Sequence, residues 1–319
     1  MTDLLTITLN PTLDLSATTG HVVAGTKLRL DEPTAEPGGG GINVARAAQA
    51  LGGQARAVAA LGGTTGARIR HLIEASGLPL AVFRLAEESR QSLAVIDRGT
   101  GQQYRFVMPG PHWSAQTVAE LLTRLADDVR RMGPGAVVVL SGSQPPGIGP
   151  EFPQALAERI PQARLIVDTS GEALRRLVEA PLATAKPYVL RMDRGESEDL
   201  AGHPLPDAVA SADFAQGLVR AGVADCVVLA RGAEGSVLAT WTDRLHCTPP
   251  QVPVSSAVGA GDSFVAGLAL AMARSQPMTE ALTLGTAAAA ATMMTPGTEL
   301  CRGSDVARLL GKCHVDVVP

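Results

Sequence analysis

Aromatic residues and cysteines are scarce in this chain, and neither sign of charge dominates. Of its 319 residues, 3% are Phe, Trp or Tyr, four are Cys, and the formal net charge is −4. A protein so close to neutral has no overall basic field with which to bind nucleic acid or an anionic membrane. Any phosphate that the protein binds must therefore be held by a local pocket.

The few cysteines also lack the spacing of a metal site or a redox pair. No C-x-x-C pair occurs among Cys226, Cys247, Cys301 and Cys313. We therefore expect reduced thiols in a cytoplasmic protein. The start of the chain has no basic segment followed by an apolar one, so we expect no secretory signal. No apolar run reaches the roughly 18 residues of a membrane span, and residues 281–294, which come closest, fit a buried helix better.

Short apolar runs alternate with helical patterns along the chain. Four runs are apolar throughout, which is typical of strands in a parallel sheet covered on both faces. These runs are residues 4–9, 136–140, 165–167 and 226–230. Between them, apolar residues recur at i, i+3, i+4 and i+7, as from Val44 to Leu51 and from Val118 to Leu125. The pattern predicts an α/β fold with a doubly wound, mostly parallel sheet.

Residues 12–36 and 81–107 interrupt this rhythm. Polar and apolar residues alternate there, residues 98–101 read as a turn, and residues 102–108 read as a returning strand. We expect the two segments to form a small β-sheet that projects as a lid, a dimer interface, or both. Because we find no internal repeat and no low-complexity linker, residues 1–319 are predicted to form a single domain that carries this lid.

A turn of small residues opens a predicted helix near residue 260. Its sequence is Gly259-Ala260-Gly261-Asp262, and apolar residues follow at helical spacing. Glycines at a helix start let the backbone approach a ligand, and the free N–H groups and the helix dipole favour an anion such as a transferring phosphoryl group. Asp262 could then accept the proton of an attacking hydroxyl, or it could simply cap the helix.

Four consecutive glycines, residues 38–41, lead directly into another predicted helix. They join no two domains, so close approach of the backbone to a polar ligand explains them better than a flexible linker does. Asn43 in the first turn could bind vicinal hydroxyls or cap the helix locally. Asp14 follows the first strand, where a carboxylate either faces the ligand crevice of such a sheet or satisfies turn backbone.

Together, the two glycine segments resemble the signatures of the ribokinase-like (phosphofructokinase B) sugar kinase family. GGGGINVARAAQALGG is similar to the N-terminal signature and AVGAGDSFVAGLALAMA to the C-terminal one, in the family's order. Further stretches look closest to the minor 6-phosphofructokinases of bacteria within that family. These are KLRLDEPTAEPGGGGINVAR, GQQYRFVMPG, LSGSQPPG, VDTSGEAL and VGAGDS.

The resemblance implies a ribokinase-like three-layer fold, a homodimer formed through the β-lid, and Mg-ATP as the donor to a primary hydroxyl of a sugar phosphate. Fructose 6-phosphate is the first expectation, giving fructose 1,6-bisphosphate in glycolysis. The alternatives in the same class are 1-phosphofructokinase and tagatose-6-phosphate kinase. A K⁺ ion near Val258 and Gly297 is left open. Nucleic acid and membrane are not expected partners.

Matching the family's motifs residue by residue assigns a role to each position. Asp262 would be the catalytic base, and Gly259, Ala260 and Gly261 would form the anion hole. The implied substrate-binding residues are Asp14, Lys27, Arg29, Gly39, Asn43, Arg90 and Ser141. Among them Arg90, with Lys27 or Arg29, would hold the phosphate of the substrate. The implied nucleotide-binding residues are Arg191, Asp193, Arg231, Gly232 and Gly235, with the Arg231 side chain facing phosphate or solvent.

One motif departs from the family pattern. Where Lys-Pro-Asn-x-x-Glu is expected, the chain has Arg191-Met192-Asp193-Arg194-Gly195-Glu196. Glu196 would organise Mg²⁺ through water, and Asp193 would either tighten metal binding or repel the phosphates of ATP. The departure motivates an alternative from another class, a non-catalytic sensor of sugar phosphates or nucleotides. The retained Asp262 argues against a sensor, which has no need of a base.

Overall fold

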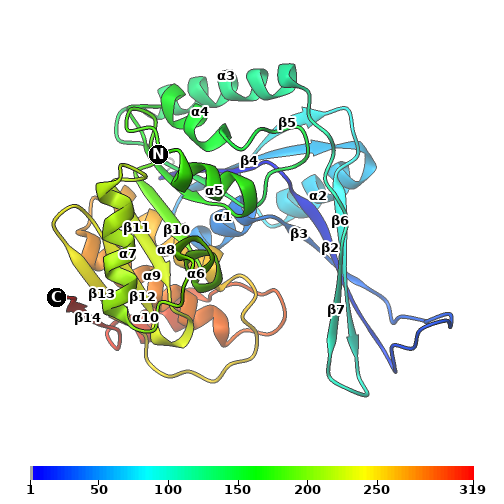
Figure 1. The fold of residues 1–319 in the computed structure, drawn as a ribbon. Coiled ribbons are helices and arrows are strands. Elements are labelled where there is room, and N and C mark those ends of the chain that lie inside the picture. Colours follow the sequence, from blue (N-terminus) through cyan, green and yellow to red (C-terminus); the bar gives the residue numbers. More distant parts are fainter. Residues whose placement is uncertain (1–2) are drawn as a thin grey trace.

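The computed structural model describes residues 3–319, and its largest feature is a ten-stranded sheet (Figure 1). Seven neighbouring strands are parallel, and the three at one edge are antiparallel. The spatial order is β14 (His314–Val317), β13 (Arg244–Thr248), β12 (Ser236–Ala239), β11 (Cys226–Ala230), β10 (Val189–Met192), β9 (Arg164–Asp168), β8 (Val137–Ser141), β1 (Leu4–Thr8), β4 (Ala55–Gly62) and β5 (Leu80–Leu85). All four predicted apolar runs lie in the parallel part, which confirms the predicted α/β sheet.

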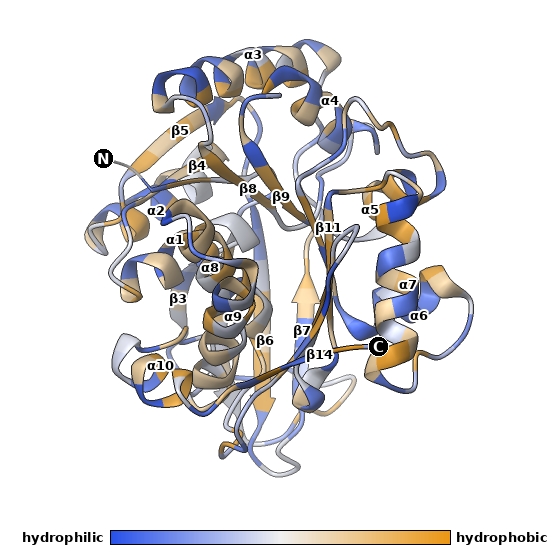
Figure 2. Ribbon diagram, turned by 90° about the vertical axis from the view of Figure 1, so that its left-hand side faces the viewer, coloured by the Kyte–Doolittle hydropathy of each residue, from blue (hydrophilic) through white to orange (hydrophobic). Residues whose placement is uncertain are grey.

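Helices cover both faces of this sheet and give three layers (Figure 2). One face carries α1 (Gly40–Ala50), α2 (Gly63–Ala75), α8 (Ala260–Ala273), α9 (Met278–Met293) and α10 (Gly303–Leu310). The other carries α3 (Ala115–Met132), α4 (Phe152–Arg159), α5 (Gly171–Glu179), α6 (Arg194–Ala201) and α7 (Ala208–Arg220). No helix within residues 3–319 is long and apolar enough to span a membrane.

Helix α8 is apolar nearly all round because α1, α9 and the sheet enclose it. Its closest neighbour is α9, and a Cβ added at Gly267 would lie 2.8 Å from the backbone carbonyl of Leu284. Helix α9 confirms the predicted buried helix at residues 281–294. Such close packing fixes the direction of α8, and so it fixes where the first turn of α8 meets the edge of the sheet.

A second, four-stranded sheet projects from the main body (Figure 1). Its order is β3 (Thr34–Gly38), β2 (Thr12–Thr19), β6 (Arg90–Asp97) and β7 (Gln103–Val107). The predicted turn at residues 98–101 and the returning strand are confirmed, since β6 and β7 pair antiparallel. The predicted start of this segment at residue 81 is wrong. Residues 80–85 form β5, which pairs in parallel with β4 because its apolar side chains complete the edge of the main core.

Candidate active site

The carboxyl ends of the central strands meet the first turns of two helices at one edge of the main sheet. Helix α1 approaches so closely that a Cβ at Gly40 would lie 2.2 Å from Ser141 Oγ, at the end of β8. A Cβ at Gly41 would lie 2.5 Å from the carbonyl oxygen of Ile7 on β1. The glycine run therefore allows close approach of α1 to the ends of β1 and β8, and it is not a flexible linker. Its predicted approach to a polar ligand stays a prediction.

Asp262, in the first turn of α8, lies against this meeting point. Asn43 Nδ2 of α1 donates a hydrogen bond of 2.9 Å to Asp262 Oδ2. Burial, and then the nearby Asp168 carboxylate, raise the pKa of Asp262 to about 7. The carboxyl group is thus close to half ionised at neutral pH, which suits a general base. The structure places Asn43 on the base, so its amide oxygen is the part that remains for a ligand hydroxyl.

The turn before Asp262 has the backbone of an anion site. Gly259 adopts φ +79° and caps α8, and the N–H of Ser263 closes the first helical turn onto the Gly259 carbonyl at 2.9 Å. The N–H of Ala260 donates to the Ala257 carbonyl oxygen at 3.4 Å, and the N–H groups of Gly261 and Asp262 are first-turn donors without helical acceptors. The dipole of α8 adds a partial positive charge at the same place.

A pocket lies beside Asp262, between the small sheet and the first turns of α1 and α8. Its charged side chains are Asp14 on β2, Glu36 on β3, which pairs with Arg46 on α1 at 4.0 Å, and Arg105 on β7. Asn43 and the turn at Gly259 also line it. Burial raises the pKa of Asp14, although hydrogen bonds from Ser92 and Thr12 and the charges of Arg105 and Arg90 oppose the increase. The pocket thus combines a partly desolvated carboxylate with guanidinium groups, as binding a hydroxylated anion requires.

The predicted substrate residues are not all gathered at this pocket. Arg90, half-buried at the start of β6, donates from Nε to the carbonyl oxygen of Asn10 at 3.2 Å, and it lies near Asp14. Gly39 precedes α1 with φ +123°, which only glycine adopts readily. Lys27 and Arg29 are exposed in the segment between β2 and β3 and do not line the pocket of their own chain.

Asp193 and Glu196 form a capping box at the start of α6. Asp193 Oδ1 accepts the N–H of Glu196 at 2.8 Å, and Glu196 Oε2 accepts the N–H of Asp193 at 2.9 Å. Burial raises the pKa of Glu196, and the negative charges of Asp193 and Asp168 add to this effect. Each carboxylate keeps one oxygen outside the capping box, so each can still accept a water molecule.

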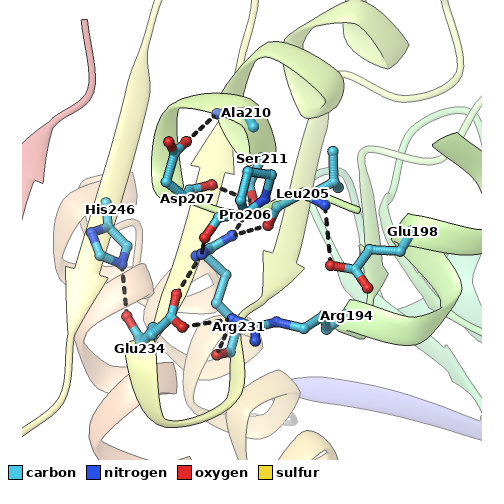
Figure 3. A network of polar contacts seen from close by, with 10 residues as sticks. All are labelled: Arg194, Glu198, Leu205, Pro206, Asp207, Ala210, Ser211, Arg231, Glu234 and His246. Atoms are coloured by element: carbon cyan, nitrogen blue, oxygen red, sulfur yellow. Dashed lines mark hydrogen bonds and ion pairs between the residues drawn. The ribbon is translucent and has the colours of Figure 1, made fainter. Parts of the chain in front are cut away.

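Arg231 corrects the prediction that its side chain faces phosphate or solvent (Figure 3). The side chain is 3% exposed. Its guanidinium donates to the carbonyl oxygens of Leu205 at 3.0 Å and Pro206 at 3.1 Å, and it contacts Ser211 and Glu234. Because these protein groups already occupy both terminal nitrogens, Arg231 has a structural role and cannot reach a nucleotide.

A glycine turn follows Arg231. Gly232 begins the short helix η1 (Gly232–Glu234) with φ +63°, and Gly235 follows it with φ +97°. Arg194 of α6 donates to the Arg231 carbonyl oxygen at 3.0 Å and pairs with Glu234 at 3.1 Å (Figure 3). The start of α6 and the glycine turn are thus tied together, although a nucleotide-binding role for either stays a prediction.

Three further polar residues belong to the site but are absent from the predicted set. Asp168 ends β9 and accepts hydrogen bonds from Ser141 Oγ at 3.2 Å and Arg191 Nη1 at 3.1 Å. Its place at the carboxyl end of a predicted strand is a signal that could have found it. Arg46 and Arg105 line the pocket, and the helical spacing from Asn43 indicates the first of them.

The donor set near α6 fits a magnesium ion that is bound mainly through phosphates and water. Within residues 3–319, no cluster of three or more His, Cys, Asp or Glu side chains could hold a metal alone. Mg²⁺ in phosphoryl-transfer sites is bound by one or two carboxylates together with substrate phosphates and water molecules. Glu196, with its free oxygen, supplies one such carboxylate.

Comparison with known proteins decides the family. The model of the pfkB family carbohydrate kinases matches residues 5–304. The chain belongs to this family. It is 37% identical to ATP-dependent 6-phosphofructokinase isozyme 2 of Escherichia coli K12 over 97% of this chain and 98% of that protein. It is 35% identical to the protein of the same name in Mycobacterium tuberculosis CDC 1551, over 96% and 88%. A 1-phosphofructokinase of Xanthomonas campestris is 32% identical over 84% and 83%.

Solved structures of a pfkB kinase share this fold over nearly the whole chain. Phosphofructokinase-2 of E. coli in complex with potassium has a TM-score of 0.88 at 34% identity, covering 98% of this chain and 99% of that one. The complex of that enzyme with fructose-6-phosphate has a TM-score of 0.87 at 33% identity, with the same coverage. Its tetrameric inhibited form has a TM-score of 0.86 at 33% identity over 98% and 99%. This pfkB member is therefore a carbohydrate kinase with the predicted ribokinase-like fold.

Proposed function

We propose that this pfkB kinase transfers the γ-phosphoryl group of ATP to the C1 hydroxyl of fructose 6-phosphate. The observation that carries the proposal is the place of Asp262. It stands in the first turn of α8, accepts a hydrogen bond from Asn43 of α1, and lies beside a pocket that contains Asp14 and Arg105. The relatives named 6-phosphofructokinase isozyme 2 support the substrate, since their similarity covers nearly the whole chain.

Each residue of the site then has a task in the transfer. Asp14 binds hydroxyls of the sugar, and Arg90 and Arg105 provide charge for its phosphate. Asp262 accepts the proton of the attacking hydroxyl, and its pKa of about 7 leaves enough carboxylate for this at neutral pH. The first-turn N–H groups of α8 stabilise the charge on the transferring group. Mg²⁺, when bound near Glu196, neutralises charge on the phosphates of ATP.

A panel of acceptors tests the substrate. ADP formation is measured with fructose 6-phosphate, fructose 1-phosphate and tagatose 6-phosphate at saturating Mg-ATP. The highest kcat/KM is expected with fructose 6-phosphate. Preference for either of the other two would replace the proposed substrate by 1-phosphofructokinase or tagatose-6-phosphate kinase activity. Tight binding without ADP formation from any of them would favour a sensor.

The capping box leads to a prediction about Mg²⁺. We expect Asp193→Asn to keep α6 intact, because Asn caps a helix as well as Asp does. The Asp193 carboxylate repels the phosphates of ATP unless metal neutralises it, so its removal should keep or raise kcat and lower the dependence on free Mg²⁺. The measurement is kcat against free Mg²⁺. Superimposable curves for both proteins would show that Asp193 does not contact the metal and phosphates.

The matched control for this prediction is Asp207→Asn. Asp207 caps α7 in the same way, with Oδ1 accepting the N–H of Ala210 at 2.8 Å. The control loses one carboxylate at a helix N-terminus without touching the start of α6. Its Mg²⁺ curve should match that of the wild type. A shift in the control as large as that of Asp193→Asn would point to a general effect of charge.

We further propose that two chains pair through the small sheet. On the face of its edge strand β7 that points away from the pocket, Phe106 is 55% exposed, and Met108, two residues on, is 49% exposed on the same side. Apolar clusters of this kind mark interaction surfaces. With a second chain on this face, Lys27 and Arg29 could reach the substrate phosphate in the pocket of the partner chain.

A K⁺ ion near Gly297 and a cytoplasmic location stay predictions.

Phe106→Asp should weaken this dimer at least ~10-fold, because it buries a charge at the centre of an apolar interface. Sedimentation equilibrium over a range of concentrations measures the dissociation constant. Trp241→Asp is the control, since Trp241 is 66% exposed but lies between β12 and β13 of the main sheet. Equal dissociation constants for Phe106→Asp and wild type would remove β7 from the interface.

A further inference from the structure

Three neighbouring strands end in a row of polar side chains beneath the anion site. Ser141, Asp168 and Arg191 come from β8, β9 and β10. The strand register pairs Ser141 with Asp168, and Asp168 with Arg191. Directly paired residues of adjacent parallel strands place their side chains on the same face. The row is therefore fixed by the main-chain hydrogen bonds of the sheet, and it does not depend on a flexible loop.

The charged members of the row are paired and largely shielded from water. Arg191 Nη1 donates to Asp168 Oδ1 at 3.1 Å, and each side chain is 13% exposed. Although burial opposes it, the charges of Asp168, Glu196 and Asp193 raise the pKa of Arg191. Charge interactions are stronger in such a site than at the surface, because less water screens them. Removal of either partner would leave the other charge acting on its neighbours.

The two ends of the row lie against the anion turn and the Asp262 carboxyl group. A Cβ at Gly261 would lie 3.1 Å from both terminal nitrogens of Arg191, so the guanidinium packs against the anion turn. Its Nε has no protein partner among residues 3–319. At the other end, the Ser141 hydroxyl donates to Asp168 Oδ2 at 3.2 Å and also lies within reach of the Asp262 carboxyl.

We infer that the Arg191–Asp168 ion pair positions the carboxyl group of Asp262. The ion pair acts on that carboxyl group through the Ser141 hydroxyl and across the anion turn, residues 259–261. The inference rests on the proposed role of Asp262 as the base. The groups that act on the Asp262 carboxyl are Asn43 of α1, Ser141 of β8, Asp168 of β9 and Arg191 of β10. Two of them are charged, and they act in opposite directions.

The opposite signs give two opposite expectations. Asp168 disfavours the ionised form of Asp262, and Arg191 favours it. Asp168→Asn should therefore lower the pKa of Asp262, and Arg191→Met should raise it, each by about one pH unit. Arg191→Lys keeps the charge and should leave the pKa close to that of the wild type. The double variant Arg191→Met with Asp168→Asn loses both charges and should lie between the single variants.

The titration is read directly, without any substrate. The protein is labelled with carboxyl-¹³C aspartate, and the Asp262 signal is assigned by its loss in Asp262→Asn. The control is Arg164→Met, because Arg164 starts the strand that Asp168 ends and its guanidinium bonds the Gly135 carbonyl oxygen. The control removes an arginine from the opposite end of β9. Its Asp262 titration should match the wild type.

The acidic limb of kcat/KM for the sugar phosphate should move with the titration, down for Asp168→Asn and up for Arg191→Met. The ionisation of the substrate phosphate, near pH 6, is common to all the variants and cancels in the comparison. Unchanged titrations in both single variants, or shifts in the same direction, would overturn the inference. Failure of every sugar phosphate in the panel would refute the proposed function, while the NMR result would still decide whether the ion pair controls Asp262.

Discussion

Asp262→Asn is expected to lower kcat about 10²–10⁴-fold, which is the usual contribution of a general base. The KM values for ATP and the sugar phosphate should change little. An asparagine has the same shape, and its amide oxygen can still accept the hydrogen bond from Asn43 Nδ2. The anion turn and the pocket therefore remain in place, and only the proton acceptor is lost. Steady-state kinetics with both substrates measure this change.

Asp305→Asn provides the matched control. Asp305 also stands in the first turn of a helix, α10, but it lies away from the pocket and pairs with Arg308. If carboxylates in a first turn serve only the helix dipole, both variants should lose a similar, small amount of stability and keep their kcat. A kcat of Asp262→Asn near that of the wild type would leave Asp262 as a helix-end charge and would remove the base from the proposed mechanism.

Arg90→Ala should raise KM for the sugar phosphate about 10- to 150-fold, while KM for ATP stays nearly constant. Loss of a charge-assisted contact costs about 1.5–3 kcal/mol, and about 1.4 kcal/mol corresponds to a factor of ten. Arg90 is suited to this contact because its Nε is fixed on the Asn10 carbonyl oxygen, which leaves its terminal nitrogens for a ligand.

The control for Arg90→Ala is Arg84→Ala. Arg84 is exposed on β5, in the main sheet just before the small sheet begins. It should leave both KM values unchanged. Equal increases in both KM values for Arg90→Ala would instead mean that the substitution disturbs the base of the small sheet through the loss of the Asn10 contact.

The parts of the site that could be predicted from the sequence are those built from neighbouring residues. The glycine turn before Asp262 and the glycine run before Asn43 both stand at helix starts, as local patterns indicate. Their contact could not be predicted in the same way. Asn43 and Asp262 are 219 residues apart, and only the packing of α1 on α8 brings them together.

The predictions for Arg231 and for residues 81–85 are wrong for the same physical reason, since both places depend on contacts with segments that are distant in the sequence. Arg231 was expected to face phosphate or solvent, and burial of an unpaired guanidinium would be costly. The carbonyl oxygens of Leu205 and Pro206 remove that cost, and no local pattern shows that this loop folds back onto the arginine. Similarly, residues 81–85 were expected in the lid, although four of the five are apolar. Their assignment to the main sheet depends on pairing with β4, which lies nearer the start of the chain.

The long separation between Asn43 and Asp262 has a consequence for biosynthesis. A chain is made from its N-terminus, and domains fold as their parts emerge. The strands that carry Asp14, Ser141 and Asp168 are complete well before α8 is made, so a nascent chain can have these three residues in place and still lack Asp262. Contacts between distant segments also form slowly. If Asp262 is the base, turnover should begin only when α8 docks on α1, and chains that end before α8 should not consume ATP.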